Sequence, residues 1–159
     1  MPFRFSVALT LVASGCIADQ WSKIALQAYL DTHPPMQWFF VTIKAMWNCG
    51  ISFGLFPCHS LAQKIVLLTI HSILILVLIR HYGKMHHKQS ALGILAMISG
   101  ALGNFIDRII YGKVFDFIAV KIGPWDFPVF NLADMLISIG FLLVCFDMNA
   151  YKKNAPTHN

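Results

Sequence analysis

The sequence predicts an all-α polytopic membrane protein with four transmembrane helices and a small extracytoplasmic β subdomain. Hydrophobic residues make up 57% of the 159-residue chain and charged residues only 12%. The mean hydropathy of +0.65 is too high for an ordinary soluble domain. All seven acidic residues are aspartates, so we do not interpret the charges as the glutamate-rich surface of solvated helices.

Four apolar runs define the expected helices, in the order FRFSVALTLVASGCIA, IVLLTIHSILILVLI, ALGILAMISGALGNFI and LADMLISIGFLLVCF. Each run is about 15 residues long, and crossing a bilayer takes ~20, so polar flanks must enter the membrane. We therefore expect helices at approximately 3–28, 61–80, 90–110 and 131–151. Because there is no internal repeat or soluble second domain, residues 1–159 are expected to form a single membrane domain.

Two outer segments, residues 31–58 and 111–130, connect the helices. In the first, MQWFFVTIKAMW is rich in aromatic and β-branched residues and follows the breaker HPP, which predicts a short strand over residues 36–47. In the second, YGKVFDFIAVKIGPWDFPVF combines partial alternation with Gly and Pro, which predicts strand and loop at the level of the lipid headgroups. Trp38, Trp47 and Trp125 fit an interfacial aromatic belt.

The distribution of basic residues favours both termini on the inner side of the membrane. The Lys and Arg residues divide equally between the two sides, but the inner ones are concentrated in the short loop RHYGKMHHK and in YKK after the last helix. The outer cations are interleaved with six of the seven aspartates, as expected for paired groups.

Polar side chains gather at the outer ends of three predicted helices. Ionisable groups inside a membrane are energetically expensive, which makes them functional candidates. In DQWSK, Asp19 and Lys23 lie one helical turn apart and are close enough to pair. The other candidates are Asn104, Asp107 and Arg108 in GALGNFIDR, Asn131 and Asp134 at the start of the fourth helix, and Asn48 and Asp116 in the outer segments.

Each of these residues also has a purely structural interpretation. Asp134 could be a charge that complements the helix dipole. The other structural roles are a helix-end ion pair for Asp19 and Lys23, a clamp between segments for Asp107 and Arg108, interhelical hydrogen bonds for Asn104 and Asn131, and a solvated loop position for Asp116.

Asp116 and Asp134 suggest a catalytic pair, because a short loop could return the chain from the third helix to the fourth. Two carboxylates in a low-dielectric site share a proton. The ionised partner can then accept a proton from water while the neutral partner polarises a carbonyl. Such a pair needs no metal, cofactor or covalent nucleophile. The spacing allows the two side chains to meet but does not establish that they do.

The segments DQWSK, WNCGISFG, GALGNFIDRIIYGKVFDF and PVFNLAD resemble, in order and spacing, the signature blocks of bacterial lipoprotein signal peptidase, or signal peptidase II. The resemblance implies four helices and a small half-open sheet over the site. It also implies that Asp116 and Asp134 form a catalytic dyad. The residues implied to line or support this dyad are Asp19, Lys23, Asn48, Gly50, Asn104, Asp107, Arg108 and Asn131.

The activity implied by this resemblance is that of an aspartic endopeptidase. Its substrates would be diacylglyceryl-modified prolipoproteins, cut before the lipidated cysteine at the extracytoplasmic face of the bacterial inner membrane. Such an enzyme works among membrane lipids, without a metal or other cofactor, and has no nucleic-acid partner.

Two other functions remain open at this point. FRFSVALTLVASGC is similar to a lipoprotein signal peptide, which would make Cys16 a lipidation site and the chain a membrane-anchored partner. Asp107, Asp116 and Asp134 could instead line the ion path of a transporter or channel, although four short helices make a thin pore wall.

Cys49 and Cys58 both face outward and could form a disulfide. His71 is interpreted as a hydrogen-bonded helix-packing residue.

Overall fold

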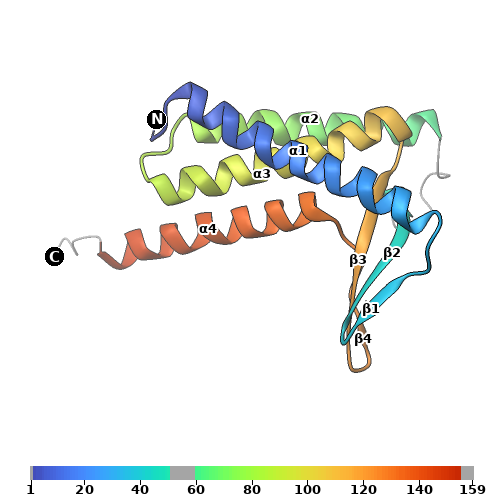
Figure 1. The fold of residues 1–159 in the computed structure, drawn as a ribbon. Coiled ribbons are helices and arrows are strands. Elements are labelled where there is room, and N and C mark those ends of the chain that lie inside the picture. The colour runs from blue at the N-terminus through green and yellow to red at the C-terminus, as the bar shows by residue number, and fades with distance from the viewer. Residues whose placement is uncertain (1, 51–59, 155–159) are drawn as a thin grey trace.

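The structure, a computed structural model, describes residues 2–50 and 60–154, with side chains up to Asp147. This part of the chain is mostly helical and includes four helices and a small antiparallel sheet (Figure 1). The helices are α1 (Phe5–Leu30), α2 (Leu61–Tyr82), α3 (Lys88–Tyr111) and α4 (Leu132–Asn154). The strands are β1 (Met36–Trp38), β2 (Val41–Asn48), β3 (Val114–Ile122) and β4 (Trp125–Asp126).

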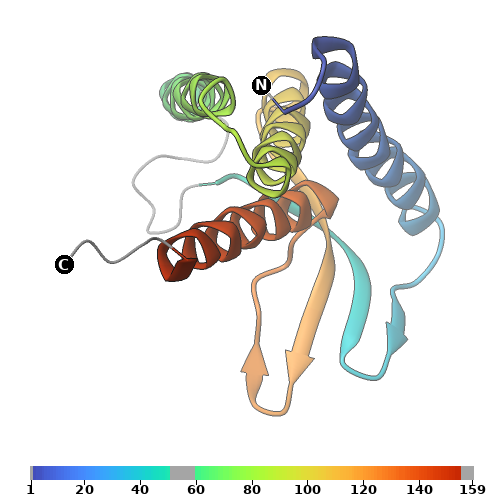
Figure 2. The same ribbon diagram turned by 90° about the vertical axis from the view of Figure 1, so that its left-hand side faces the viewer.

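Helix α3 lies at the centre of the bundle and contacts α1, α2 and α4 (Figure 2). Its closest neighbour is α4, because glycines allow the two backbones to approach. A Cβ added at Gly93 would lie 2.6 Å from the carbonyl oxygen of Gly140, and one at Gly100 would overlap the carbonyl oxygen of Ala133. The apolar core beside this contact includes Ala91, Ile94 and Ile98 of α3.

Two of the described helices, α2 and α3, are long and apolar enough to cross a membrane. Helix α2 packs mainly on α3, and much of its apolar surface, including Ile70 and Leu76, is exposed. Helices α1 and α4 are not in this set, although exposed apolar side chains such as Leu9 and Phe141 lie along them. Four membrane spans therefore remain a prediction. Cys16 lies inside the continuous helix α1, so cleavage before it would cut within a helix.

The sheet has the strand order β1-β2-β3-β4, with every neighbouring pair antiparallel. The strand expected over residues 36–47 is present but divided in two, because the chain reverses at Phe39 and Phe40 and forms a hairpin of β1 and β2. Phe39 has a φ of 47°, in the left-handed region that favours glycine. The sequence lacks the Gly, Asn or Asp that normally marks such a turn, so the reversal could not be predicted.

The sheet extends from one end of the bundle and lies across the direction of the helices (Figures 1 and 2). Strand β3 follows α3 directly, and the segment after β4 returns the chain to α4. In the pairing of β2 with β3, Trp47 lies opposite Phe115 and Asn48 opposite Val114. The last residues of β2 and the first residues of β3 therefore lie beside the ends of the helices.

Candidate active site

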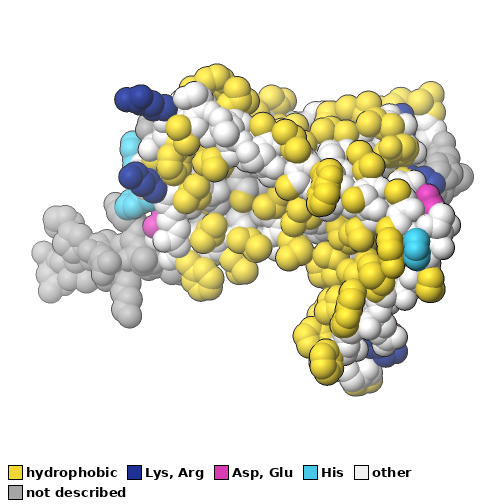
Figure 3. Space-filling view, viewed as in Figure 1, with side chains coloured by type: hydrophobic (Ala, Val, Ile, Leu, Met, Phe, Trp, Pro, Cys, Tyr) yellow, Lys and Arg dark blue, Asp and Glu magenta, His cyan; other side chains and the backbone are white. Residues whose placement is uncertain are grey.

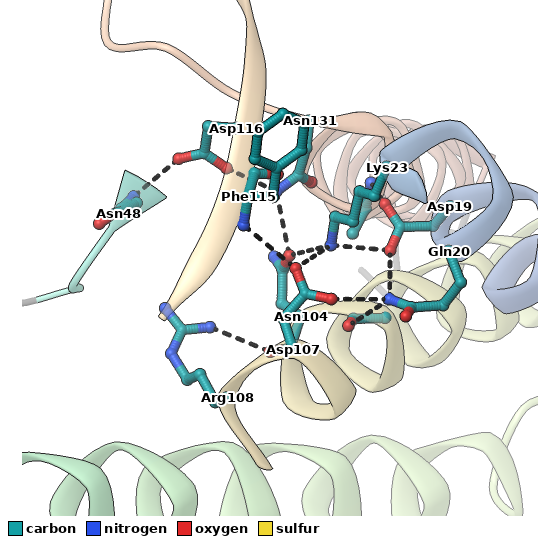
Figure 4. A network of polar contacts seen from close by, with 12 residues as sticks. Asp19, Gln20, Lys23, Asn48, Asn104, Asp107, Arg108, Phe115, Asp116 and Asn131 are labelled. Atoms are coloured by element: carbon teal, nitrogen blue, oxygen red, sulfur yellow. Dashed lines mark hydrogen bonds and ion pairs between the residues drawn. The ribbon is translucent and has the colours of Figure 1, made fainter. Parts of the chain in front are cut away.

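Polar side chains of α1, α3, α4, β2 and β3 lie together where the sheet meets the helix ends. Figure 4 shows part of this network. These side chains form an ion cluster, made of Asp19, Lys23 and Asp107, and a carboxylate pair, made of Asp116 and Asp134. In Figure 4, Asn104 lies between the ion cluster and the side chains of Asp116 and Asn131.

The ion cluster is buried and centres on Lys23 of α1. Its Nζ lies 2.8 Å from Oδ2 of Asp19 and 3.0 Å from Oδ2 of Asp107, and it donates a hydrogen bond of 3.0 Å to Oδ1 of Asn104. Breaking a buried ion pair is costly because it leaves an uncompensated charge. The three charged groups therefore depend on one another and connect α1 to α3.

Both carboxylates of the ion cluster also accept backbone hydrogen bonds. Asp19 Oδ1 accepts one of 2.8 Å from the N–H of Ala133, in the first turn of α4. Asp107 Oδ2 accepts one of 3.1 Å from the N–H of Phe115, next to Asp116. The cluster therefore fixes both chain segments that carry the carboxylate pair. Asp107 thus links α3 to α1 through Lys23 and to β3 through Phe115, which is the clamp between segments considered as its structural role.

Gln20 hydrogen-bonds to the ion cluster, although we did not predict it as a site residue. Its Nε2 donates hydrogen bonds of 2.9 Å to Oδ1 of Asp107 and 3.0 Å to the carbonyl oxygen of Gly103. The only sequence signal was an amide next to Asp19 in an apolar helix. The direction in which the Gln20 side chain points depends on how α1 and α3 pack, which the sequence does not show.

Asn131 connects the two members of the carboxylate pair. It precedes α4, and its Oδ1 accepts a hydrogen bond of 3.0 Å from the N–H of Asp134. In return, Asp134 Oδ2 accepts one of 3.1 Å from the N–H of Asn131, as in a capping box. The Nδ2 of Asn131 donates 2.6 Å to Oδ1 of Asp116 and 3.1 Å to Oδ1 of Asn104. One buried residue thus contacts both carboxylates.

Asp116 is a buried residue of β3, so its structural alternative as a solvated loop residue is wrong. Its second oxygen, Oδ2, accepts a hydrogen bond of 2.9 Å from Nδ2 of Asn48. Burial raises the pKa of Asp116 to about 6; the Asn48 hydrogen bond opposes this rise and the negative charge of Asp134 adds to it. Asp134 is partly exposed, and its Oδ1 accepts a hydrogen bond of 2.8 Å from Nδ2 of Asn104.

Gly50 and Arg108 complete the site behind Asn48. The N–H of Gly50 donates 2.7 Å to Oδ1 of Asn48, which orients that amide toward Asp116. Gly50 has a φ of +81°, and a Cβ there would lie 3.0 Å from Nη2 of Arg108, so both conformation and space favour glycine. The Arg108 guanidinium interacts electrostatically with Asp134, Asp116 and Asp107.

Each carboxylate of the pair borders a different pocket. A pocket of about 530 Å³ has mostly apolar walls, including Val120, Phe130 and Ile139, and reaches Asp134. A pocket of about 370 Å³ is lined by residues that include Asn48, Gly50 and Asp116. Pro128 lines both pockets and so lies between them. A molecule bound here could contact both carboxylates while placing an apolar group beside Asp134.

All ten residues singled out from the sequence lie in this site or its immediate support. Within the described residues, no three His, Cys, Asp or Glu side chains are close enough together to bind a metal ion. The disulfide considered between Cys49 and Cys58 involves a residue outside the described part of the chain.

Comparison with known proteins places this chain in a family. The family described as signal peptidase (SPase) II matches residues 11–150. The lipoprotein signal peptidase of Burkholderia multivorans is 36% identical over 135 residues, which cover 81% of this chain and 79% of that protein. The one from Wigglesworthia glossinidia brevipalpis is 37% identical over 114 residues, covering 72% and 74%.

Solved structures agree with this comparison. One bacterial membrane enzyme, determined at 2.3 Å resolution, superimposes with a TM-score of 0.82 at 25% identity and covers 99% of this chain and 96% of that one. A second, at 1.9 Å resolution, gives a TM-score of 0.81 at 26% identity, with coverages of 92% and 95%. The chain belongs to the signal peptidase II family.

Proposed function

We propose that this protein is an intramembrane aspartic endopeptidase that removes signal peptides from diacylglyceryl-modified prolipoproteins, cutting before the lipidated cysteine. The observation that carries this proposal is the bridge formed by Asn131, which hydrogen-bonds to both Asp116 and Asp134. Family membership supports the substrate class. The apolar pocket beside Asp134 supports a substrate that carries lipid.

The reaction would use the carboxylate pair with one shared proton. In this scheme Asp134 accepts a proton from a water molecule, whose oxygen attacks the carbonyl carbon of the scissile bond. Asp116 donates its proton to the carbonyl oxygen, giving a tetrahedral intermediate. The intermediate then breaks when the leaving nitrogen takes the proton from Asp134 and the new carboxyl group returns one to Asp116. The raised pKa of Asp116 favours it as the partner that keeps the shared proton.

The neighbouring amides would hold the two carboxylates in a fixed geometry. Asn48 and Asn131 donate to Asp116, and Asn104 donates to Asp134. Side chains that are held by such contacts need little rearrangement when substrate binds. The charge of Arg108 would favour the ionised member of the pair, and the ion cluster would hold the segments that carry both aspartates.

We also propose that all four helices cross the bacterial inner membrane, with both termini inside and the site at the extracytoplasmic face. Figure 3 supports this placement, because hydrophobic side chains cover most of the helix surface in view while Lys and Arg lie toward the ends. The sheet would then lie along the membrane surface with the exposed side chains of Phe39 and Trp125 near lipid. A substrate anchored by its acyl chains could reach the site laterally.

The substrate class can be tested with purified protein in detergent and one prolipoprotein prepared with and without its diacylglyceryl group. We expect cleavage of the lipidated form alone, and the mass of the mature product should begin at the lipidated cysteine. Equal cleavage of both forms, or a cut at another bond, would contradict the proposed specificity. No cleavage of either form would contradict the peptidase assignment.

A further inference from the structure

His71 brings α2 into contact with the candidate site. It lies in the apolar sequence LLTIHSILIL, where a polar side chain must find hydrogen-bond partners. Its Nδ1 lies 2.8 Å from the carbonyl oxygen of Leu67, and its Nε2 lies 3.2 Å from Nη1 of Arg108. Because a carbonyl oxygen only accepts, these partners assign the proton to Nδ1 and leave Nε2 as the acceptor for Arg108.

We propose that His71 is a positioning residue, which holds the guanidinium of Arg108 beside the carboxylate pair through a hydrogen bond from Nη1 to Nε2. This inference rests on the proposed function for its effect on catalysis. The contact itself is a property of the folded protein and can be tested without substrate.

Three carboxylates attract the charge of Arg108, but among the described residues few other hydrogen bonds fix the orientation of its side chain. Its Nη1 also donates to the carbonyl oxygen of Asn104, but at 3.4 Å, which is a long hydrogen bond. Its Nε is buried and has no hydrogen-bond partner among the described residues. Hydrogen bonds to a charged group are roughly twice as strong as those between neutral groups. His71 therefore forms the shorter of the two hydrogen bonds that the described residues make with this guanidinium.

The position of this guanidinium affects Asp116 through a short series of contacts. Nη2 of Arg108 packs close to Gly50, since a Cβ added there would lie 3.0 Å from it. Gly50 donates its N–H to Asn48, and Asn48 donates its amide to Asp116. If Arg108 turns away, the charge beside the two carboxylates moves, and the side chain that packs next to Gly50 moves with it.

Three single variants test this role. His71→Leu removes the acceptor, and His71→Gln keeps an acceptor oxygen on a side chain of similar reach. His81→Leu is a matched control, since Nδ1 of His81 makes the same type of contact, 3.1 Å to the carbonyl oxygen of Val77, but the side chain is exposed. We expect His71→Leu to lower kcat on the lipidated substrate about tenfold with KM changed less than about twofold. His71→Gln should recover kcat to within about threefold of wild type, and His81→Leu should match wild type.

A double-mutant cycle separates positioning from a general structural role. In an Arg108→Leu background, His71→Leu should change kcat by less than about twofold, because the group it positions is already absent. A tenfold fall in both backgrounds would overturn the inference. A His71→Leu protein that unfolds at the wild-type temperature and keeps the wild-type kcat would also overturn the inference.

The contact can also be measured without turnover, by NMR of isotope-labelled arginine side chains in the purified protein in detergent. The Arg108 Nε–H resonance should shift in His71→Leu, return toward its wild-type position in His71→Gln and stay unchanged in His81→Leu. No shift in His71→Leu would overturn the inference. If the wild type cleaves no lipidated substrate, the proposed function fails, but this spectrum still tests the contact between His71 and Arg108.

Discussion

At the scale of single residues, Asn131 combines two roles that are usually separate. Its Oδ1 and backbone N–H complete a reciprocal cap with Asp134, and its Nδ2 donates to Asp116. The hydrogen bonds that start α4 are therefore the same ones that hold the two carboxylates in position. A substitution here should affect stability and activity together.

This coupling predicts that removing one helix cap lowers both stability and kcat, whereas removing another lowers stability alone. Asn131→Ala should lower the free energy of unfolding by about 1–3 kcal/mol, because it removes the cap and leaves buried groups without partners. Its kcat should fall about 100-fold, since both carboxylates lose a fixed neighbour. Ser60→Ala is the matched control: it removes the α2 cap, in which Ser60 Oγ accepts a 3.1 Å hydrogen bond from the N–H of Gln63. It should cost about 1 kcal/mol and leave kcat unchanged. Equal kcat in both variants would contradict the coupling.

The raised pKa of Asp116 predicts a pH-dependent stability. The unfolded chain loses this proton near its ordinary pKa of 3.8, whereas the folded protein keeps it to about 6. The stability contributed by protonated Asp116 is therefore present at low pH and is lost as pH rises through this window. Compared with wild type, Asp116→Asn should gain about 1–3 kcal/mol between about pH 4 and about pH 8. Thermal unfolding in detergent at several pH values measures this difference. A constant difference would contradict the buried, proton-holding state of Asp116.

The helical period made some residue contacts predictable. Asp19 and Lys23 lie one turn apart on a single helix, so their pairing follows from local geometry. The contact of Lys23 with Asp107 joins two helices and depends on how closely α1 and α3 pack. The direction of Gln20 depends on the same packing, which explains why it was missed.

At the scale of elements, the close packing of α3 on α4 sets the distance between Asn104 and Asp134. Gly100 lies one turn before Asn104, and Ala133 directly precedes Asp134. Because Gly100 faces the backbone of Ala133, the same contact that joins the helices aligns the two polar side chains. The four apolar runs located the helices, but the pairing of α3 with α4 could not be deduced from hydropathy alone.

Adding one methyl group at this contact should therefore separate the helices. Gly100→Ala places a Cβ against the carbonyl oxygen of Ala133 and should cost about 2–3 kcal/mol of stability. It should also reduce activity, because Asn104 moves away from Asp134. Gly83→Ala is the control, since its Cβ would make an ordinary contact of 3.6 Å and its φ of −59° suits alanine. Thermal unfolding and kcat measured for both variants test the contact; similar stability for the two would contradict it.

At the scale of the whole molecule, the bundle and the sheet present very different surfaces. Exposed apolar side chains run along the helices, and the sheet extends sideways from one end (Figures 1 and 3). In the proposed orientation, the membrane covers the helices and the sheet lies on the outer surface.

This orientation predicts which lysines are accessible from outside. In intact spheroplasts, a membrane-impermeant amine reagent should modify Lys121, which is exposed in the sheet, and should not modify Lys84 at the opposite end of the bundle. After lysis both should react, which shows that Lys84 is chemically accessible. Mass spectrometry of the digested protein measures the labelling. Modification of Lys84 in intact spheroplasts, with Lys121 unmodified, would contradict the proposed topology.

The most direct test of the carboxylate pair is the kcat of Asp116→Asn and Asp134→Asn on a diacylglyceryl-modified prolipoprotein. Asp126→Asn is the matched control, because Asp126 is an exposed residue of the same sheet that pairs with Lys121 at 3.4 Å. We predict that both site variants remain folded and bind substrate but lose at least about 1,000-fold in kcat, while the control stays within about twofold of wild type. Near wild-type turnover by folded Asp116→Asn or Asp134→Asn protein would show that the pair does not perform the hydrolysis.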